Sequence, residues 1–136
     1  MVNDPISDML IRINNAQMVK HEQVSMPFSK VKFAIANILK ANGFISGIER
    51  NKKKIKKTEH DYLELTLRYD ENDNSGAISG FKIISRPSRH MYIKANEIKP
   101  VRSGYGIAVI STPKGIMSSK DAKKNKLGGE VMFEMY

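Results

Sequence analysis

Two segments in the first half of the chain carry apolar side chains at the spacing of one helical face. The first runs from Pro5 to about Gln17, with Asp4 as a preceding N-cap and proline at the first helical position. The second begins after Ser29, another side chain that caps helices. Asn42-Gly43 ends it, because glycine readily adopts the left-handed backbone conformation found at helix C-termini. We therefore predict two helices in this half.

Other segments have the pattern of strands. Residues 62–69 alternate leucine with polar side chains, as a strand with one buried face does. Shorter strands are expected over residues 23–26, 44–49, 78–85, 107–110 and 131–136. Pro113-Lys114-Gly115 predicts a tight turn, and a short basic helix is expected to begin at Ser118 or Ser119 and reach Lys126. Gly128-Gly129 would stop that helix.

Residues 70–76 contain no apolar side chain and are typical of a turn or linker. We place a domain boundary there, which predicts an N-terminal α/β domain over residues 1–72 and a C-terminal domain over residues 73–136. Helices and strands mix in both halves, without the regular alternation of a doubly wound parallel sheet. The expected fold class is α+β, with two small α/β-type domains packed together and mixed short sheets with helices.

The charge of the chain narrows its possible partners. Its 136 residues include 23 Lys and Arg against 14 Asp and Glu, which gives a net charge of +9. A compact cation attracts polyanions, of which nucleic acid is the commonest and an anionic membrane surface the second. The third explanation of the charge is a lysine-rich surface that binds no partner. Composition alone does not separate these three readings.

The compartment follows from what the sequence lacks. It contains no cysteine, which fits a reducing environment. No apolar run approaches the length needed to cross a bilayer. The first five residues hold an acid and a helix start where a signal peptide would carry basic charge. We expect a cytoplasmic protein.

The residues needed for enzyme chemistry are missing. His21, His60 and His90 are isolated, with no second ligand at metal spacing. Gly104-Tyr105-Gly106 lacks the third glycine of a dinucleotide fingerprint and precedes a strand instead of following one. Ser111 and its neighbour have no nearby histidine in sequence to activate them. We predict no catalytic residue, no metal site and no cofactor.

Two basic features remain. The segment Lys52–Lys57 is either a solvated hairpin tip that discourages edge-to-edge aggregation or a functional contact, with equal weight. The second feature is the C-terminal third, where lysines and an arginine surround small and hydroxyl residues that let a ribose-phosphate chain approach closely. Glu130 is unusual in this setting. It could read exocyclic amines or 2′-hydroxyls, or it could orient a lysine, and the residues alone favour neither role.

At this point the sequence resembles a known family. Residues 106–117 (GIAVISTPKGIM), Ala122 and residues 127–130 (LGGE) closely resemble the C-terminal signature of the bacterial small-subunit ribosomal protein S-eight family. The opening residues 4–15 (DPISDMLIRINN) and Ser85-Arg86-Pro87 are similar to that family as well. The matches run in order along nearly the whole chain. Each piece is weak alone, but the set is highly specific.

The resemblance implies a primary RNA-binding protein of the small ribosomal subunit. Members of the family bind the central domain of the small-subunit ribosomal RNA at a helix with an irregular internal loop, and neighbouring ribosomal proteins. Bacterial members also repress translation of their own operon's messenger RNA through a similar site. No membrane or cofactor is implied. Carried over by motif, the expected RNA contacts are Ser111, Thr112, Lys114, Gly115, Gly128, Gly129, Glu130 and Tyr92, with Lys30 as an addition from the N-terminal half.

The sequence also departs from the family pattern. Pro113 stands where many members carry serine, the loop over residues 52–60 looks longer and more basic than usual, and residues 71–77 have no clear counterpart. A polybasic membrane-surface protein is the main alternative function. It would need apolar anchors beside the charge, and residues 120–127 offer only Ala122 and Leu127. An enzyme acting on RNA is the third hypothesis, against which the missing general base and metal ligands count.

Overall fold

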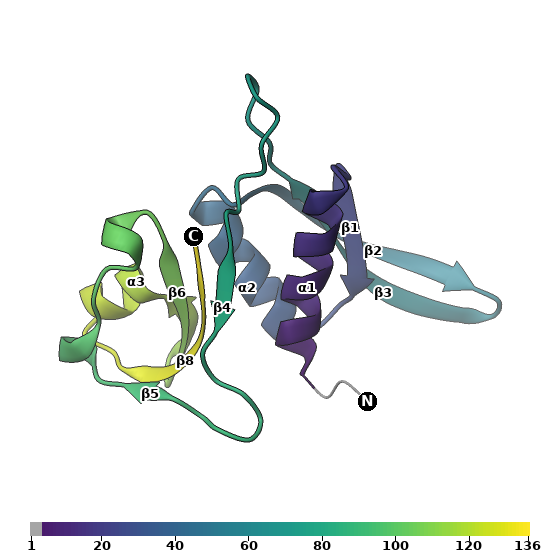
Figure 1. The fold of residues 1–136 in the computed structure, drawn as a ribbon. Coiled ribbons are helices and arrows are strands. Elements are labelled where there is room, and N and C mark those ends of the chain that lie inside the picture. The colour runs from purple at the N-terminus through teal and green to yellow at the C-terminus, as the bar shows by residue number, and fades with distance from the viewer. Residues whose placement is uncertain (1–3) are drawn as a thin grey trace. The chain divides into compact units, whose positions relative to one another are not determined.

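The computed structural model describes residues 4–136, which divide into two compact units. Pro5–Ala77 makes up the N-terminal unit, and the C-terminal unit contains Ile78–Tyr136. Each unit combines helices with an antiparallel sheet (Figure 1), which confirms the predicted α+β class. The proposed domains 1–72 and 73–136 stay a prediction, and residues 1–3 lie outside the described part of the chain.

The helices of the N-terminal unit begin and end where their capping residues predict. α1 spans Pro5–Met18 and α2 spans Lys30–Ala41. The Ser29 hydroxyl accepts a hydrogen bond of 3.1 Å from the backbone N–H of Lys32, which satisfies one of the donors left open in the first helical turn. Gly43, with φ +80°, follows the C-cap of α2 in the left-handed conformation. Both predicted helices are confirmed.

A three-stranded antiparallel sheet completes this unit. β1 (Gln23–Pro27), β2 (Ile45–Ile55) and β3 (Thr58–Leu67) lie in the order β1-β3-β2. The alternating leucines of β3 turn inward, as their period predicts. These leucines pack with apolar side chains of α1 and α2. Each large apolar side chain that is fully buried stabilises the fold by roughly 1.5–3 kcal/mol. This core includes Met9, Leu10, Ile13, Met26, Ile35, Ala36, Leu39, Ile45, Leu63, Leu65 and Leu67.

The β2–β3 hairpin is longer than the sequence predicted. The strand expected to end near Glu49 continues to Ile55, so the lysine run lies mainly in a strand and only Lys56 and Lys57 occupy the turn. The prediction that Lys52–Lys57 forms the hairpin tip is therefore wrong for all of the segment but its end. Polar residues extend a strand without difficulty when both of its faces are exposed, because only the backbone ladder has to be satisfied.

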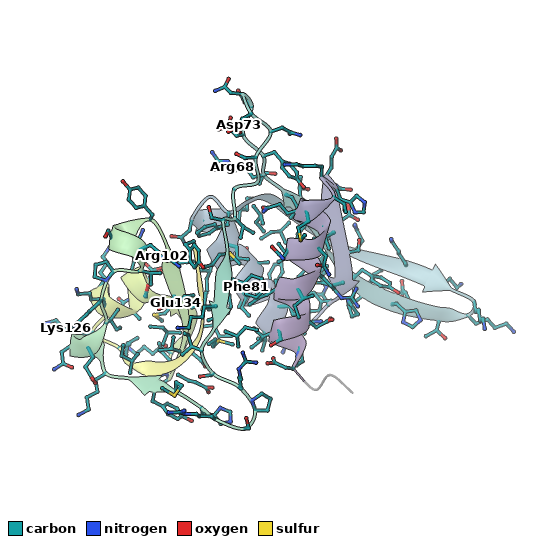
Figure 2. All side chains as sticks on the ribbon, in the orientation of Figure 1. Arg68, Asp73, Phe81, Arg102, Lys126 and Glu134 are labelled. Atoms are coloured by element: carbon teal, nitrogen blue, oxygen red, sulfur yellow. The ribbon has the colours of Figure 1, made fainter. Side chains whose placement is uncertain are left out.

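The polar segment 70–76 is a hydrogen-bonded loop that belongs to the N-terminal unit. The Asp70 carboxylate accepts hydrogen bonds from the backbone N–H groups of Asn72 (2.8 Å) and Asp73 (3.2 Å), as in an Asx turn. The backbone N–H of Asp70 donates to Ser75 across the loop. Figure 2 shows Asp73 at the outer end of this loop. Local side-chain acceptors thus take the place of an apolar core in ordering the segment.

The C-terminal unit is built on a five-stranded antiparallel sheet in the order β4-β8-β6-β7, with β5 paired to β8 as well. Its last strand therefore contacts three others. Two single-turn 3₁₀ helices and one short α-helix connect the strands. The elements are β4 (Phe81–Ile83), β5 (Tyr92–Ile93), η1 (Ala95–Glu97), η2 (Arg102–Gly104), β6 (Ile107–Thr112), β7 (Gly115–Ser118), α3 (Ser119–Lys124) and β8 (Gly129–Met135).

α3 covers one face of this sheet. Ala122 of the helix is fully buried against Ala108 and Ile110 of β6, and the η1–η2 segment adds Ile98 and Val101 to the same cluster. Ser118 caps the helix by accepting a hydrogen bond of 3.2 Å from the Asp121 backbone, as one of the two predicted caps. The helix ends at Lys124, two positions before the predicted end at Lys126.

Several strands of this unit differ from their predicted extent. The strand predicted over residues 78–85 pairs regularly only as β4, and β5 and β7 were not predicted. Beside β4 the ladder is irregular on both sides. Ser79 and Gly80 both donate to the Tyr136 carbonyl, and Ile84 and Ser85 both donate to the Met132 carbonyl. Shared acceptors of this kind satisfy the backbone without regular strand geometry.

An ion pair at the base of the β2–β3 hairpin makes the stability of the fold depend on pH. Arg50 donates to the Asp61 carboxylate at 3.0 Å, and this hydrogen bond is the main reason that the pKa of Asp61 lies below its ordinary value of 3.8. A lowered folded-state pKa gives stability that is present above the unfolded pKa and lost as pH falls through the folded pKa. Asp61→Asn should therefore lower the melting temperature at neutral pH, and the difference from the parent should vanish well below pH 3.8.

Thermal unfolding followed by circular dichroism across this pH range measures the effect. Glu59→Gln is the matched control, since it removes a carboxylate from the same face of the same strand. A difference between parent and Asp61→Asn that stays constant at every pH would show that the ion pair does not stabilise the fold.

Candidate nucleic-acid interface

Three of the predicted contact residues form a row across neighbouring strands of the C-terminal unit. Glu130 of β8 lies directly opposite Tyr92 of β5 on one side and Ser111 of β6 on the other. Residues opposite each other in an antiparallel ladder project to the same face of the sheet, so these side chains are neighbours. Tyr92 is 73% exposed and therefore accessible to a large partner. We call Tyr92, Glu130 and Ser111 the cross-strand row.

The row faces away from α3. Ile110 and Val131, the next residues along β6 and β8, pack into the cluster around Ala122. Since side chains alternate between the two faces of a sheet, the row projects from the other face. The sequence grouped Lys120–Lys126 with this region, but α3 carries Lys120, Lys123 and Lys124 on the opposite face. These lysines give the unit a basic surface that is separate from the row.

Glu130 has a partner that the sequence did not predict. Its Oε2 atom lies 2.8 Å from Nδ1 of His90, a hydrogen-bonding distance for an imidazole and a carboxylate. The Glu130 side chain is 26% exposed, so it is shielded on one side and open on the other. His90 was interpreted as an isolated surface residue. The two lie far apart in sequence, and only the pairing of β5 with β8 brings them together.

The turn between β6 and β7 holds three more of the predicted residues. Thr112 opposes Gly115 across a two-residue turn made by Pro113 and Lys114. The Thr112 hydroxyl donates to the Gly115 carbonyl at 2.7 Å and accepts from the Lys114 backbone at 3.2 Å. Thr112 is buried, so its hydroxyl closes the turn, while Lys114 and Gly115 are exposed. The turn therefore presents one lysine and an open stretch of backbone.

Gly128 and Gly129 hold the row together through close packing. A Cβ atom at Gly129 would collide with the backbone carbonyl oxygen of Ser111. A Cβ atom at Gly128 would lie 2.5 Å from the carbonyl oxygen of Ile93. Glycine at these two positions thus lets β8 approach both neighbouring segments, and this approach sets Glu130 beside Ser111.

Lys30 belongs to a different place. It is the exposed first residue of α2 in the N-terminal unit. No cluster of three or more His, Asp or Glu side chains that could hold a metal ion occurs in residues 4–136. Within the same described range, no helix is long and apolar enough to span a membrane. The chemistry that the cross-strand row offers is hydrogen bonding and aromatic stacking, with positive charge nearby.

The family model for ribosomal protein S8 matches residues 4–136. The chain belongs to the ribosomal protein S8 family. The small ribosomal subunit protein uS8 of Bacillus cereus (strain B4264) is 45% identical over 132 residues, which cover 97% of this chain and 96% of that protein. The small ribosomal subunit protein uS8 of Staphylococcus saprophyticus is 42% identical over 131 residues, which cover 96% of each chain. The resemblance found in the sequence is thereby confirmed.

Membership of the S8 family settles the broad class of the protein. The matched relatives are structural ribosomal proteins and not enzymes, and the match extends over nearly the whole chain. This chain is therefore a ribosomal protein of the cytoplasm and not an enzyme. The hypothesis of an enzyme that acts on RNA is discarded.

The packing role of Gly129 leads to a stability prediction for this S8-family chain. Gly129→Ala places a methyl group against a backbone carbonyl of β6, which cannot rotate away as a side chain can. We expect a loss of about 1–3 kcal/mol in the free energy of unfolding, as for other overpacked sites. Urea unfolding measures this loss, and Gly47→Ala is the control, because its Cβ would meet Thr66 at an ordinary 3.4 Å. Equal losses in the two variants would mean that close approach at Gly129 has no special importance.

Proposed function

We propose that this chain is a structural constituent of the small ribosomal subunit, as its relatives' names describe those proteins. In this role it binds the central domain of the small-subunit ribosomal RNA at a helix with an irregular internal loop, and it is needed for subunit assembly. Neighbouring small-subunit proteins are its other partners. The observation that carries the proposal is the cross-strand row, which presents a base-stacking ring, an acceptor and a hydroxyl together.

Each side chain of the row suits a different part of RNA. Tyr92 offers an exposed ring for stacking against a base or ribose. Glu130 accepts hydrogen bonds only, which suits exocyclic amines and 2′-hydroxyls. Ser111 can both donate and accept. An irregular internal loop exposes such groups, whereas the major groove of regular A-form RNA is too deep and narrow for side chains to read.

The other predicted contacts take supporting roles in this proposal. Lys114 and the open backbone at Gly115 contact phosphates, which fix position without reading sequence. Lys30 adds a contact from the N-terminal unit. Thr112 contributes chiefly by shaping the turn, since its hydroxyl is occupied there, and Gly128 and Gly129 contribute by setting the strand spacing.

The same site serves a second RNA in this proposal. An element of the chain's own operon messenger RNA that imitates the ribosomal site would compete for the cross-strand row. Binding there would repress translation whenever free protein exceeds the available ribosomal RNA, because one surface cannot hold both ligands. This feedback needs no residue beyond those of the row.

The structure disfavours a membrane-surface function. Such a protein needs apolar side chains beside its basic ones, exposed for insertion into the lipid interface. Ala122, one of two apolar residues near the lysines of α3, is fully buried in the core of the C-terminal unit. The basic face of α3 therefore offers charge without an adequate anchor.

The role in the small subunit is tested by sedimentation. A tagged full-length chain expressed in a bacterial host should travel with small subunits through a sucrose gradient, and high salt should release it only partly. A non-ribosomal protein of similar size and charge is the control. Recovery of the chain only at the top of the gradient would contradict the proposal.

The role of the row is tested by the change Glu130→Gln. The amide adds a donor where the Glu130 carboxylate presents only acceptors, so discrimination between the ribosomal RNA fragment and an unrelated hairpin should fall by about 1–3 kcal/mol. Glu134→Gln removes the same charge from the same strand but from the α3-facing side, and should leave discrimination unchanged. Competition binding at fixed salt measures both. Equal effects of the two variants would place the recognition surface elsewhere.

A further inference from the structure

We propose that the outer part of the β2–β3 hairpin is a second RNA-binding surface, which holds unpaired nucleotides by stacking and charge. Lys53, His60 and Tyr62 form its platform, with Lys56 and Lys57 at the tip beside it. The inference rests on the proposed function only in that the chain meets RNA. It concerns residues of the N-terminal unit and does not involve the cross-strand row.

The hairpin extends well past its sheet. β1 pairs with β3 only as far as Pro27 opposite Tyr62, whereas the pairing of β2 with β3 continues to Ile55 opposite Thr58. Beyond Tyr62 the hairpin is therefore a two-stranded ribbon with both faces open to solvent (Figure 1). A segment of this kind contributes no core, so its residues are available for binding.

The register divides the lysine run between the two faces of the ribbon. Lys52 lies opposite Asp61 and Lys54 opposite Glu59, so on this face the two carboxylates offset part of the positive charge of Lys52, Lys54 and Arg50. Lys53 projects from the other face. The lysines of the strand are therefore not equivalent, because Lys52 and Lys54 each lie opposite a carboxylate and Lys53 does not.

The face that carries Lys53 has unopposed positive charge. The residue opposite Lys53 is His60, not a carboxylate. The acids on the same face, Glu49 and Glu64, pair with each other nearer the centre of the sheet. Lys56 and Lys57 add two exposed charges at the turn. A polyanion is therefore attracted to the outer end of this face and repelled from its inner end.

Two aromatic rings lie on this same face. The ring centroids of His60 and Tyr62 are 6.3 Å apart and inclined at 54°. The Lys53 ammonium lies 5.5 Å from the centre of the Tyr62 ring. Rings interleaved with cations form the usual platform for single-stranded nucleic acid, because bases stack on the rings while phosphates meet the cations. Paired bases hide their faces within the helix, so unpaired nucleotides are the ligand that fits.

The base of the ribbon is fixed, which keeps the platform in position. The Arg50 guanidinium lies 3.9 Å from the centre of the Phe28 ring while it donates to Asp61. The Phe28 backbone N–H also donates to the Asp61 carbonyl at 3.1 Å. A surface that is ordered before binding loses less conformational entropy when the ligand arrives.

A simpler explanation is that the lysines only prevent edge-to-edge aggregation. On that explanation Lys52 and Lys53 are interchangeable, because both are exposed lysines on the same strand. If the hairpin binds RNA as proposed, the two lysines have different effects, because they project from opposite faces of the ribbon. Lys53→Ala and Lys52→Ala therefore form a matched pair that removes the same charge from adjacent positions.

The experiment uses full-length protein and two fluorescent probes of about eight nucleotides, within the usual site size. One probe is oligouridine, and the other is an abasic ribose-phosphate chain of equal length and charge. Anisotropy titrations compare the parent with Lys53→Ala, Lys52→Ala, Tyr62→Leu, Tyr62→Phe and His60→Leu. All are repeated in a Tyr92→Leu background, which removes the exposed ring of the cross-strand row.

We expect the parent to bind oligouridine about tenfold more tightly than the abasic chain, the effect of roughly one stacked base. Tyr62→Leu and His60→Leu should reduce this preference, and Tyr62→Phe should retain it. Lys53→Ala should weaken binding of both probes more than Lys52→Ala does. Circular dichroism checks folding, and if Tyr62→Leu unfolds, the exposed His60→Leu still decides the question.

Equal binding of the two probes by the parent, or identical effects of Lys52→Ala and Lys53→Ala, would overturn the inference. The competition assay with Glu130→Gln separates this failure from that of the proposed function. If Glu130→Gln leaves ribosomal discrimination unchanged while the ring effects are present, the proposed role of the cross-strand row fails and the hairpin surface remains. If Glu130→Gln lowers discrimination as expected but the ring effects are absent, the hairpin surface fails and the proposed role of the row remains.

Discussion

The close approach of β8 to β6 determines the geometry of the cross-strand row. Glycine at position 129 lets the strand lie against the Ser111 carbonyl, where any side chain would collide. β8 also pairs with β5 and β4, so its register fixes three strands at once. A slip of one residue in an antiparallel ladder turns every side chain to the other face. Such a slip would move Glu130 from its place beside Tyr92 into the α3 core.

A bulge in β8 keeps this arrangement compatible with the rest of the sheet. Ile110 pairs with Val131 and Val109 with Phe133, so Met132 is an extra residue. Because of this insertion, Glu130 and Phe133 project to the same face although they are three positions apart. In a regular strand that kept Glu130 opposite Ser111, the side chain of Phe133 would project toward α3. The bulge thus lets one strand serve both a buried cluster and an exposed row.

The sequence predicts best the elements that local interactions define. Ser29 and Gly43 mark the ends of α2 through capping and backbone conformation, and the leucines of β3 show which face is buried. β5 was missed because two residues, Tyr92 and Ile93, carry no periodicity, and only the distant β8 makes them a strand. The lysine run was interpreted as a loop because its strand has no buried face to produce alternation.

The candidate site shows the same limit. The family resemblance predicted Ser111, Glu130 and Tyr92 as RNA contacts. The strand register places the three residues side by side. The position of α3 behind the sheet depends on how Ala122 packs, which a count of nearby lysines cannot reveal. The contact between His90 and Glu130 depends on pairing between segments far apart in sequence. The sequence therefore shows which residues could bind RNA, but it does not show which of them share one face of a sheet.

Glu130 gives a physical reason to separate affinity from specificity in this protein. A carboxylate beside an RNA chain is repelled by phosphates, so in a protein with a net charge of +9 it lowers the attraction that the other charges create. The lysines of α3 and of the hairpin supply charge from surfaces that do not include the row. The row can therefore tolerate a negative group whose contribution depends on what it accepts a hydrogen bond from. RNA that offers an amine or 2′-hydroxyl at that point offsets the repulsion, whereas RNA that offers neither does not, and this difference discriminates between them.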